Sequence, residues 1–92
     1  MCRNIRPLFN YDPPATSDDA RAAAIQYVRK ISGYTKPSKL NQTAFDAAVE
    51  EITTASVRLL TALVTTAPVR NREREILRLR AARLARDGSY QQ

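Results

Sequence analysis

The single cysteine of this chain is the side chain with the most distinctive chemistry. Cys2 lies between the initiating methionine and Arg3. If Met1 is removed, the thiol and the free α-amine stand on adjacent carbons and together form a bidentate metal ligand. The positive charges beside the thiol favour its reactive thiolate form. Metal binding, a mixed disulfide and redox sensing are therefore open to Cys2, and so is a passive role as a small apolar residue under the leader.

The rest of the sequence argues against catalysis. The chain has one cysteine and no histidine, so it contains neither an internal disulfide nor a Ser–His or Cys–His pair. A closed zinc site would lack its usual ligands, and the carboxylates do not follow the spacing of a calcium loop. The sequence therefore predicts a protein that is not an enzyme and that holds no metal or cofactor.

Basic side chains offer a second kind of chemistry, the binding of anions. The chain carries 15 Lys and Arg against 9 Asp and Glu, and residues 67–92 hold seven of these cations against three acids. Two groups are candidates for phosphate contacts: Arg29, Lys30, Tyr34, Lys36 and Lys39 around a loop, and Arg70, Arg72, Arg74 and Arg78 in a helix. Such cations bind a nucleic-acid backbone without reading its sequence, and an aromatic ring can stack on a base. We therefore expect nucleic acid or an acidic protein as the partner.

The arginines also have a purely structural interpretation. On a helical wheel, four apolar residues share a sector about 100° wide: Val69, Ile76, Leu77 and Leu84. The arginines flank this sector on both sides, as expected for a packing helix whose long side chains reach from a buried stripe to solvent. A further alternative is a homodimer or another protein complex formed through Leu60, Val64 and the third helix.

The residues that position these groups are expected to form three helices after an extended leader, residues 1–15. Two consecutive prolines prevent a helix at the end of this leader. Thr16 is a good N-cap, and Asp19 completes a capping box, so the first helix is expected over 17–32. Gly33 ends it.

The second helix is expected over 41–66, with Asn41 as its N-cap. Residues spaced alternately by four and three form a heptad-like seam along it: Phe45, Val49, Ile52, Ser56, Leu59 and Leu63. Pro68 is expected to begin an arginine-rich third helix over 68–87, followed by a frayed tail, 88–92. No alternation typical of strands occurs. The sequence thus predicts an all-α fold, a small three-helix bundle in one domain.

Length and hydropathy limit the setting in which this domain works. Ninety-two residues leave room for one domain. The apolar runs are far shorter than the roughly 20 residues that cross a bilayer, and no signal peptide precedes the first proline. The sequence therefore predicts a soluble, cytoplasmic protein without membrane insertion.

Five short stretches of the sequence occur together in a known family. They are MCRNI, PPAT, QYVRKISG, KPS and AFDAAVEEI, in this order within residues 1–66. Together they resemble the domain-of-unknown-function 2277 family, small uncharacterised bacterial proteins common in actinomycetes. The family brings no activity to the chain. The resemblance implies that the leader and the loop matter more than the third helix, because it assigns signature positions to Cys2, Arg3, Asn4, Arg29, Lys30, Gly33, Lys36, Pro37 and Ser38.

Overall fold

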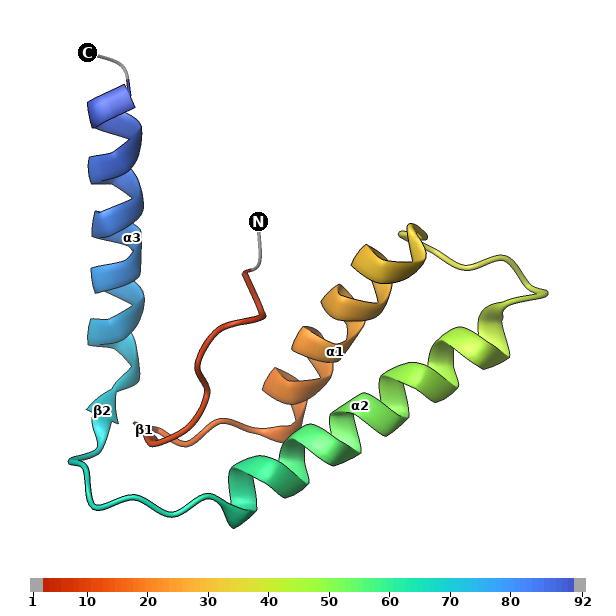
Figure 1. The fold of residues 1–92 in the computed structure, drawn as a ribbon, viewed down its shortest axis with the longest axis horizontal. Coiled ribbons are helices and arrows are strands. Elements are labelled where there is room, and N and C mark those ends of the chain that lie inside the picture. Colours follow the sequence, from red (N-terminus) through yellow and green to blue (C-terminus); the bar gives the residue numbers. More distant parts are fainter. Residues whose placement is uncertain (1–2, 91–92) are drawn as a thin grey trace.

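The computed structural model describes residues 3–90, with the side chains of residues 86–90 outside the description. Five elements follow one another along the chain (Figure 1): β1 (Tyr11–Asp12), α1 (Ser17–Ser32), α2 (Gln42–Ala62), β2 (Arg70–Asn71) and α3 (Arg72–Tyr90). The leader runs without helix or strand up to β1. Three helices and a mostly helical chain confirm the predicted fold class.

The first helix has the predicted bounds because its two ends are set by local hydrogen bonds. The Thr16 hydroxyl accepts a hydrogen bond from the Asp19 backbone N–H (3.3 Å), and the Asp19 carboxylate accepts one from the Thr16 N–H (2.8 Å). At the other end, Gly33 adopts a left-handed conformation with φ of 79°, and its N–H donates to the Arg29 carbonyl. Glycine tolerates this φ without a steric penalty.

The second helix is shorter than predicted and ends at Ala62. Leu63 already has an extended backbone, with φ of −66° and ψ of 140°. The three residues that follow it, VTT, are β-branched and therefore poor helix formers. The Thr65 hydroxyl also accepts a hydrogen bond from the Ala67 N–H, which favours a turn over a helix. Asn41 precedes α2, but its side chain makes no capping bond and instead donates to Ser38.

The core of the molecule lies between α1 and α2, which form an antiparallel pair (Figure 1). Ala24, Val28 and Val49 are buried together. Small alanine side chains on α1 let the two helices approach closely. Larger residues close the cluster at its edges: Ile25, Phe45, Ala48 and Ile52. The cluster is small, and no large side chain in the described part of the chain is completely buried.

Two very short strands join the leader to the segment before α3. β1 and β2 pair in parallel, with Tyr11 opposite Arg70 and Asp12 opposite Asn71. The sequence predicts no strand, because two residues are too few to show an alternating pattern. The pairing also changes the start of α3, which was expected at Pro68 and begins at Arg72. Asn71 caps this helix, since its side-chain oxygen accepts a hydrogen bond from the Arg74 N–H (2.7 Å).

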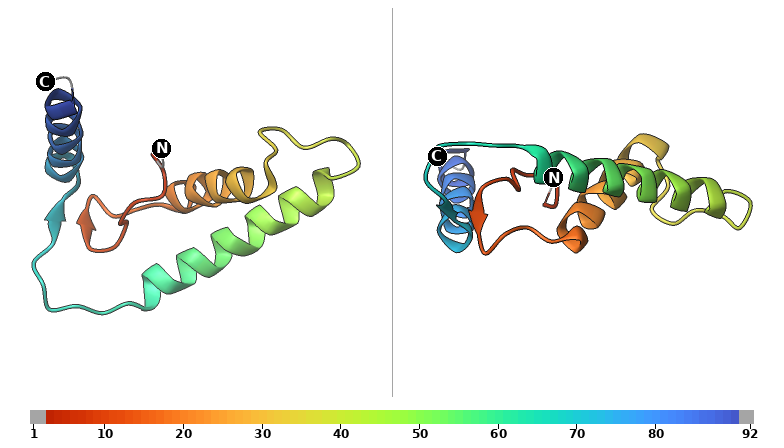
Figure 2. Two further views of the ribbon diagram at one scale, coloured as in Figure 1. Left: turned by 45° about the horizontal axis from the view of Figure 1, so that its top comes forward. Right: turned by 90° about the horizontal axis from the view of Figure 1, so that it is seen from below.

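The third helix does not pack along the other two. Figures 1 and 2 show α3 standing at the side of the α1–α2 pair, and its main contact with another element is to β2. The predicted bundle is therefore realised for two helices only. The molecule is flat, 45 × 41 × 15 Å, with a radius of gyration of 16.1 Å. A compact chain of this length has a radius of gyration of about 12 Å. The expected tail, 88–92, is helical as far as Tyr90, and residues 91–92 lie outside the described residues.

Candidate interaction surface

The leader is attached to the linker before α3 by a set of backbone and side-chain hydrogen bonds that we call the clasp, residues 9–12 with 67–71. Asn10 adopts a positive φ of 65°, which asparagine tolerates better than most residues. Its side-chain amide donates to the Pro68 carbonyl (3.0 Å), and its own carbonyl accepts from the Arg70 N–H (2.9 Å). The clasp therefore fixes where α3 leaves the body of the protein.

Tyr11 is the buried centre of this region. Only 7% of its surface is exposed, and the Arg70 guanidinium lies over its ring, 4.7 Å from the ring centroid. This arrangement is a cation–π contact. The Tyr11 hydroxyl is buried without a hydrogen-bond partner. Beside the ring is a hollow with room for about one water molecule, lined by Arg6, Pro7, Arg72, Glu75, Ile76 and Leu79. Tyr11 therefore joins the leader to the inner face of α3.

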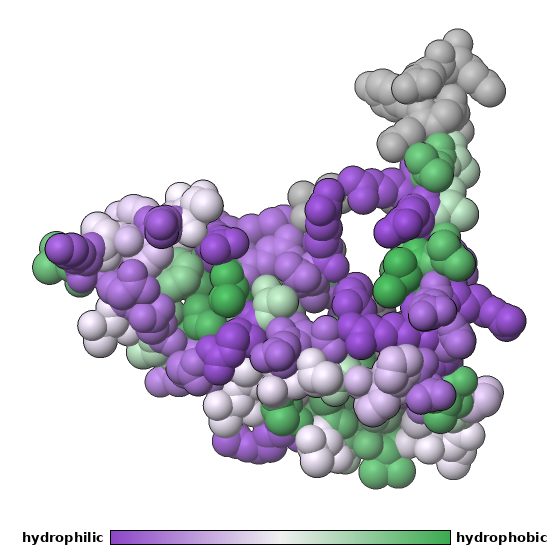
Figure 3. Space-filling view, turned by 180° about the vertical axis from the view of Figure 1, so that it is seen from behind, coloured by the Kyte–Doolittle hydropathy of each residue, from purple (hydrophilic) through white to green (hydrophobic). Residues whose placement is uncertain are grey.

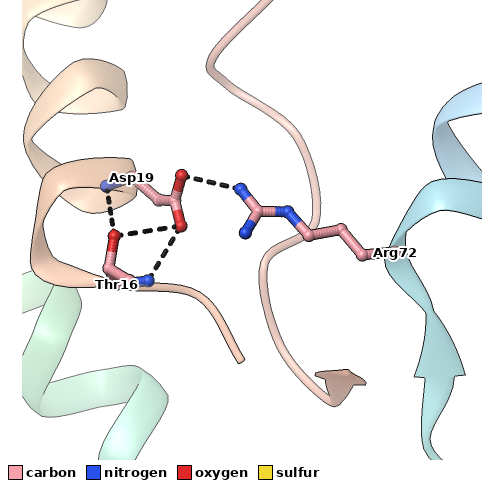
Figure 4. A network of polar contacts seen from close by, with 3 residues as sticks. All are labelled: Thr16, Asp19 and Arg72. Atoms are coloured by element: carbon pink, nitrogen blue, oxygen red, sulfur yellow. Dashed lines mark hydrogen bonds and ion pairs between the residues drawn. The ribbon is translucent and has the colours of Figure 1, made fainter. Parts of the chain in front are cut away.

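An ion pair ties the start of α3 to the start of α1. The Arg72 guanidinium donates to the Asp19 carboxylate at 2.7 Å (Figure 4), and both side chains are about four-fifths buried. The pKa of Asp19 is lowered mainly by the hydrogen bond from the Thr16 backbone N–H, with Arg72 adding to the effect and burial opposing it. The carboxylate thus serves two elements, because it caps α1 and binds α3.

Three of the four arginines predicted for helix 3 have partners within the protein. Arg70 lies in β2, where it covers Tyr11, and Arg72 binds Asp19. Arg78 pairs with Glu75 at 2.5 Å one turn away. The hydrogen bond from Arg78 lowers the pKa of Glu75. Arg74 is exposed, and its side chain forms no hydrogen bond or ion pair with the described residues. The start of α3 is therefore organised around contacts within the chain rather than around a free array of cations.

The second predicted cationic group lies elsewhere. The loop between α1 and α2 is at the far end of the helix pair from α3 (Figure 1), so the two groups do not form one surface. The group itself is exposed: Arg29, Lys30, Tyr34, Lys36 and Lys39. Lys30 takes part in an interaction within the protein. We call the others, with the loop that carries them, the basic tip.

The three signature residues predicted in the leader differ in what the structure shows of them. Cys2 lies outside the described residues. Arg3 is exposed, and the Asn4 backbone N–H donates to the Gln26 side chain of α1 (2.9 Å). This contact places the start of the leader beside the second half of α1. Within residues 3–90, no three carboxylates, cysteines or histidines gather as metal ligands would.

A large share of the apolar side chains is exposed, which the sequence did not predict. We call six of these residues, near the end of α2 and along α3, the exposed apolar set: Leu59 (57% exposed), Leu63 (43%), Val64 (91%), Val69 (62%), Leu77 (61%) and Leu84 (65%). Figure 3 shows hydrophobic side chains along α3 and at the end of α2, and an opening through the molecule beside α3. The seam of α2 continues to Leu63, beyond the point where α1 begins, so its last part has no helix to cover it.

The apolar residues of α3 lie on two faces of the helix, whereas the sequence predicted a single apolar stripe. The residues toward Tyr11 follow the spacing i, i+3, i+4, i+7 and are Arg72, Glu75, Ile76 and Leu79. Leu77 and Leu84 lie on another face and are exposed. The predicted common sector with Val69 is wrong because Val69 precedes β2 and belongs to no helix. The helix therefore has one face on the leader and a second apolar face without cover.

The solvent-accessible surface of the chain is larger than that of a compact protein of the same mass. It amounts to 7391 Å². A compact monomer of 10.3 kDa exposes about 5,400 Å². About 2,000 Å² of surface is therefore exposed beyond what a chain of this mass needs to expose.

These features define a small, mostly helical protein whose notable parts are exposed surfaces. The chain belongs to the family described as "Uncharacterized conserved protein (DUF2277)", whose model matches residues 1–78. The match includes the clasp and the first turns of α3. No curated protein and no solved structure matches the chain. Among the helices described, none combines the length and the apolar character needed to cross a membrane.

Proposed function

We propose that this protein is a non-enzymatic interaction module that binds a protein partner through the exposed apolar set. The observation that carries the proposal is the surplus of about 2,000 Å² of accessible surface over that of a compact monomer of the same mass. The exposed leucines and valines lie at the end of α2, in the linker after it and on α3. They mark a binding surface, because soluble monomers rarely leave large apolar patches uncovered.

The stability of α3 supports the same proposal. An isolated helix of this length is marginal in water, and helices in proteins are held mainly by packing of an apolar face. α3 packs through Ile76 and Leu79 near its start, whereas Leu77 and Leu84 are more than half exposed. A protein surface would bury these leucines. A nucleic-acid backbone would contact the arginines and leave the leucines in water.

The proposal requires that the open shape persists in solution. We expect small-angle X-ray scattering of the purified chain to give a radius of gyration of at least 16 Å, the value of this structure. Closure of α3 onto the helix pair would instead give about 12 Å. A value near the smaller figure would contradict the proposal, because a closed chain has no spare apolar surface to offer.

A second candidate function is polyanion binding at the basic tip. Arg29, Lys36 and Lys39 are exposed around the half-exposed Tyr34 ring, and no acidic residue occurs between Asp19 and Asp46. The loop and the last turns of α1 therefore carry positive charge only. This candidate covers nucleic acid and needs no apolar surface.

Salt dependence tests the second candidate. If three cations of the tip bind phosphates of duplex DNA, the logarithm of affinity is expected to fall with the logarithm of salt concentration at a slope of about −3. The Lys36→Ala/Lys39→Ala variant should reduce the slope to about −1. The control Arg74→Ala/Arg83→Ala, at two exposed residues of α3, should leave the slope unchanged. A flat salt response, or equal loss in both variants, would exclude the tip as the binding site. Fluorescence anisotropy with a labelled duplex measures all three proteins.

A further inference from the structure

The surplus surface is larger than the area that one partner buries in a standard protein interface. Stable interfaces bury about 800 Å² on each partner. The chain exposes about 2,000 Å² beyond a compact monomer of its mass, so one such interface fits within the surplus. The exposed apolar set is distributed over the end of α2, the linker that follows it and α3.

The outer face of α3 has the pattern of a surface that pairs with itself. Leu77 and Leu84 are seven residues apart, which is two helical turns, and both are exposed. Glu73 and Arg80 are also seven residues apart and lie along one edge of this face. Neither has an ion-pair partner recorded in the part of the chain that the structure describes, whereas Glu75 and Arg78 on the same helix pair with each other.

A two-fold axis brings this edge of one copy against the same edge of a second copy, so that acidic and basic side chains face each other. When two identical helices pack antiparallel with Leu77 near the axis, Glu73 of one copy comes level with Arg80 of the partner subunit, and the reverse pair forms as well. Leu77 of one copy then meets Leu77 of the partner subunit near the axis, as in an antiparallel coiled coil, whereas Leu84 lies beyond the first residue of the facing helix, Arg72.

We infer that the partner of the exposed α3 face is a second copy of this chain, packed antiparallel about Leu77. The inference rests on the proposed function and names its partner. Each copy carries a net charge of +6, so the two repel each other at long range. Salt screens this repulsion and also the Glu73–Arg80 pairs of the interface, so the affinity of the dimer is expected to depend only weakly on salt. The affinity of the basic tip for DNA is expected to fall steeply with salt.

Sedimentation equilibrium of the full chain tests the inference. The wild-type protein is expected to sediment with twice the monomer mass of 10.3 kDa. Leu77→Glu places a charge in the seam and should weaken the dimer at least tenfold. The matched control is Leu40→Glu, because Leu40 is 91% exposed at the opposite end of the molecule, and this variant should remain dimeric. Circular dichroism verifies that both variants retain their α1–α2 helices.

Reversing the charges of Glu73 and Arg80 tests the antiparallel orientation of the two α3 helices. Glu73→Arg should weaken the dimer, and the double variant Glu73→Arg/Arg80→Glu should restore it. A dimer that persists in Leu77→Glu, or a double variant as weak as the single one, would overturn the antiparallel arrangement. A monomeric wild-type protein with a radius of gyration near 16 Å would overturn self-association and leave the proposed interaction module standing. A monomer near 12 Å would overturn both.

Discussion

Replacing Ala24 by aspartate is expected to abolish the cooperative thermal unfolding of the α1–α2 pair. Ala24 is 1% exposed and lies in the cluster with Val28 and Val49. An unpaired carboxylate at this position would lose its hydration without gaining a counter-ion, at a cost of several kcal/mol. Small domains are stabilised by only about 5 kcal/mol in total. Circular dichroism at 222 nm, recorded during heating, should therefore show a broad, non-cooperative loss of helix.

Ala47→Asp supplies the control for this variant. Ala47 lies on α2 and is exposed, so the same substitution there tests helix propensity alone, which costs about 0.7 kcal/mol or less. Its melting curve should stay cooperative and shift by a few degrees. An Ala24→Asp protein that melts like the Ala47→Asp protein would show that the contact between α1 and α2 is not the core of the fold.

Replacing Tyr11 by alanine is expected to release α3 from the leader. The ring is the most buried aromatic group described, and it contacts Arg70 on one side and borders the hollow with Ile76 and Leu79 on the other. Large-to-small substitutions of buried aromatic residues cost about 3 kcal/mol or more. Limited trypsin digestion should cut the Tyr11→Ala protein after the arginines of the linker and α3 much faster than the wild type, because cleavage requires local unfolding.

Tyr11→Phe distinguishes the role of the ring from that of the hydroxyl. This variant keeps the ring under Arg70 and removes a buried oxygen that has no hydrogen-bond partner. Since an unsatisfied buried polar group is destabilising, the phenylalanine variant should be at least as resistant to trypsin as the wild type. Equal sensitivity of the two variants would show that the hydroxyl, and not the ring, holds α3 in place.

The parts of the fold that were predictable from the sequence are those set by neighbouring residues. α1 begins and ends where Thr16, Asp19 and Gly33 require, since each of these residues acts within one helical turn. The end of α2 was placed too late because apolar residues continue past Ala62, and hydrophobic spacing alone does not register the poor helix propensity of the β-branched run that follows.

The parts that were not predictable depend on contacts between distant residues. β1 and β2 pair Tyr11 with Arg70, and nothing in either segment alone indicates the other. This pairing moved the start of α3 from Pro68 to Arg72, which in turn removed Val69 from the predicted apolar stripe. The cationic groups were correctly found as exposed at the basic tip. At the start of α3, the pairing of Arg72 with Asp19 was not predictable, because the two residues are far apart in the sequence.

The clasp imposes an order on folding. Its two sides are about 60 residues apart, as in the bonds between Asn10 and Pro68 and between Arg70 and Phe9, so the chain between them is a closed loop that contains the whole helix pair. Closing so long a loop is entropically costly while that segment is disordered. The helix pair, built from nearer contacts, should therefore form first and bring the two sides together. α3 then becomes ordered last. Newly made chains therefore pass through a state in which the α1–α2 pair is folded and α3 has not yet packed against the leader.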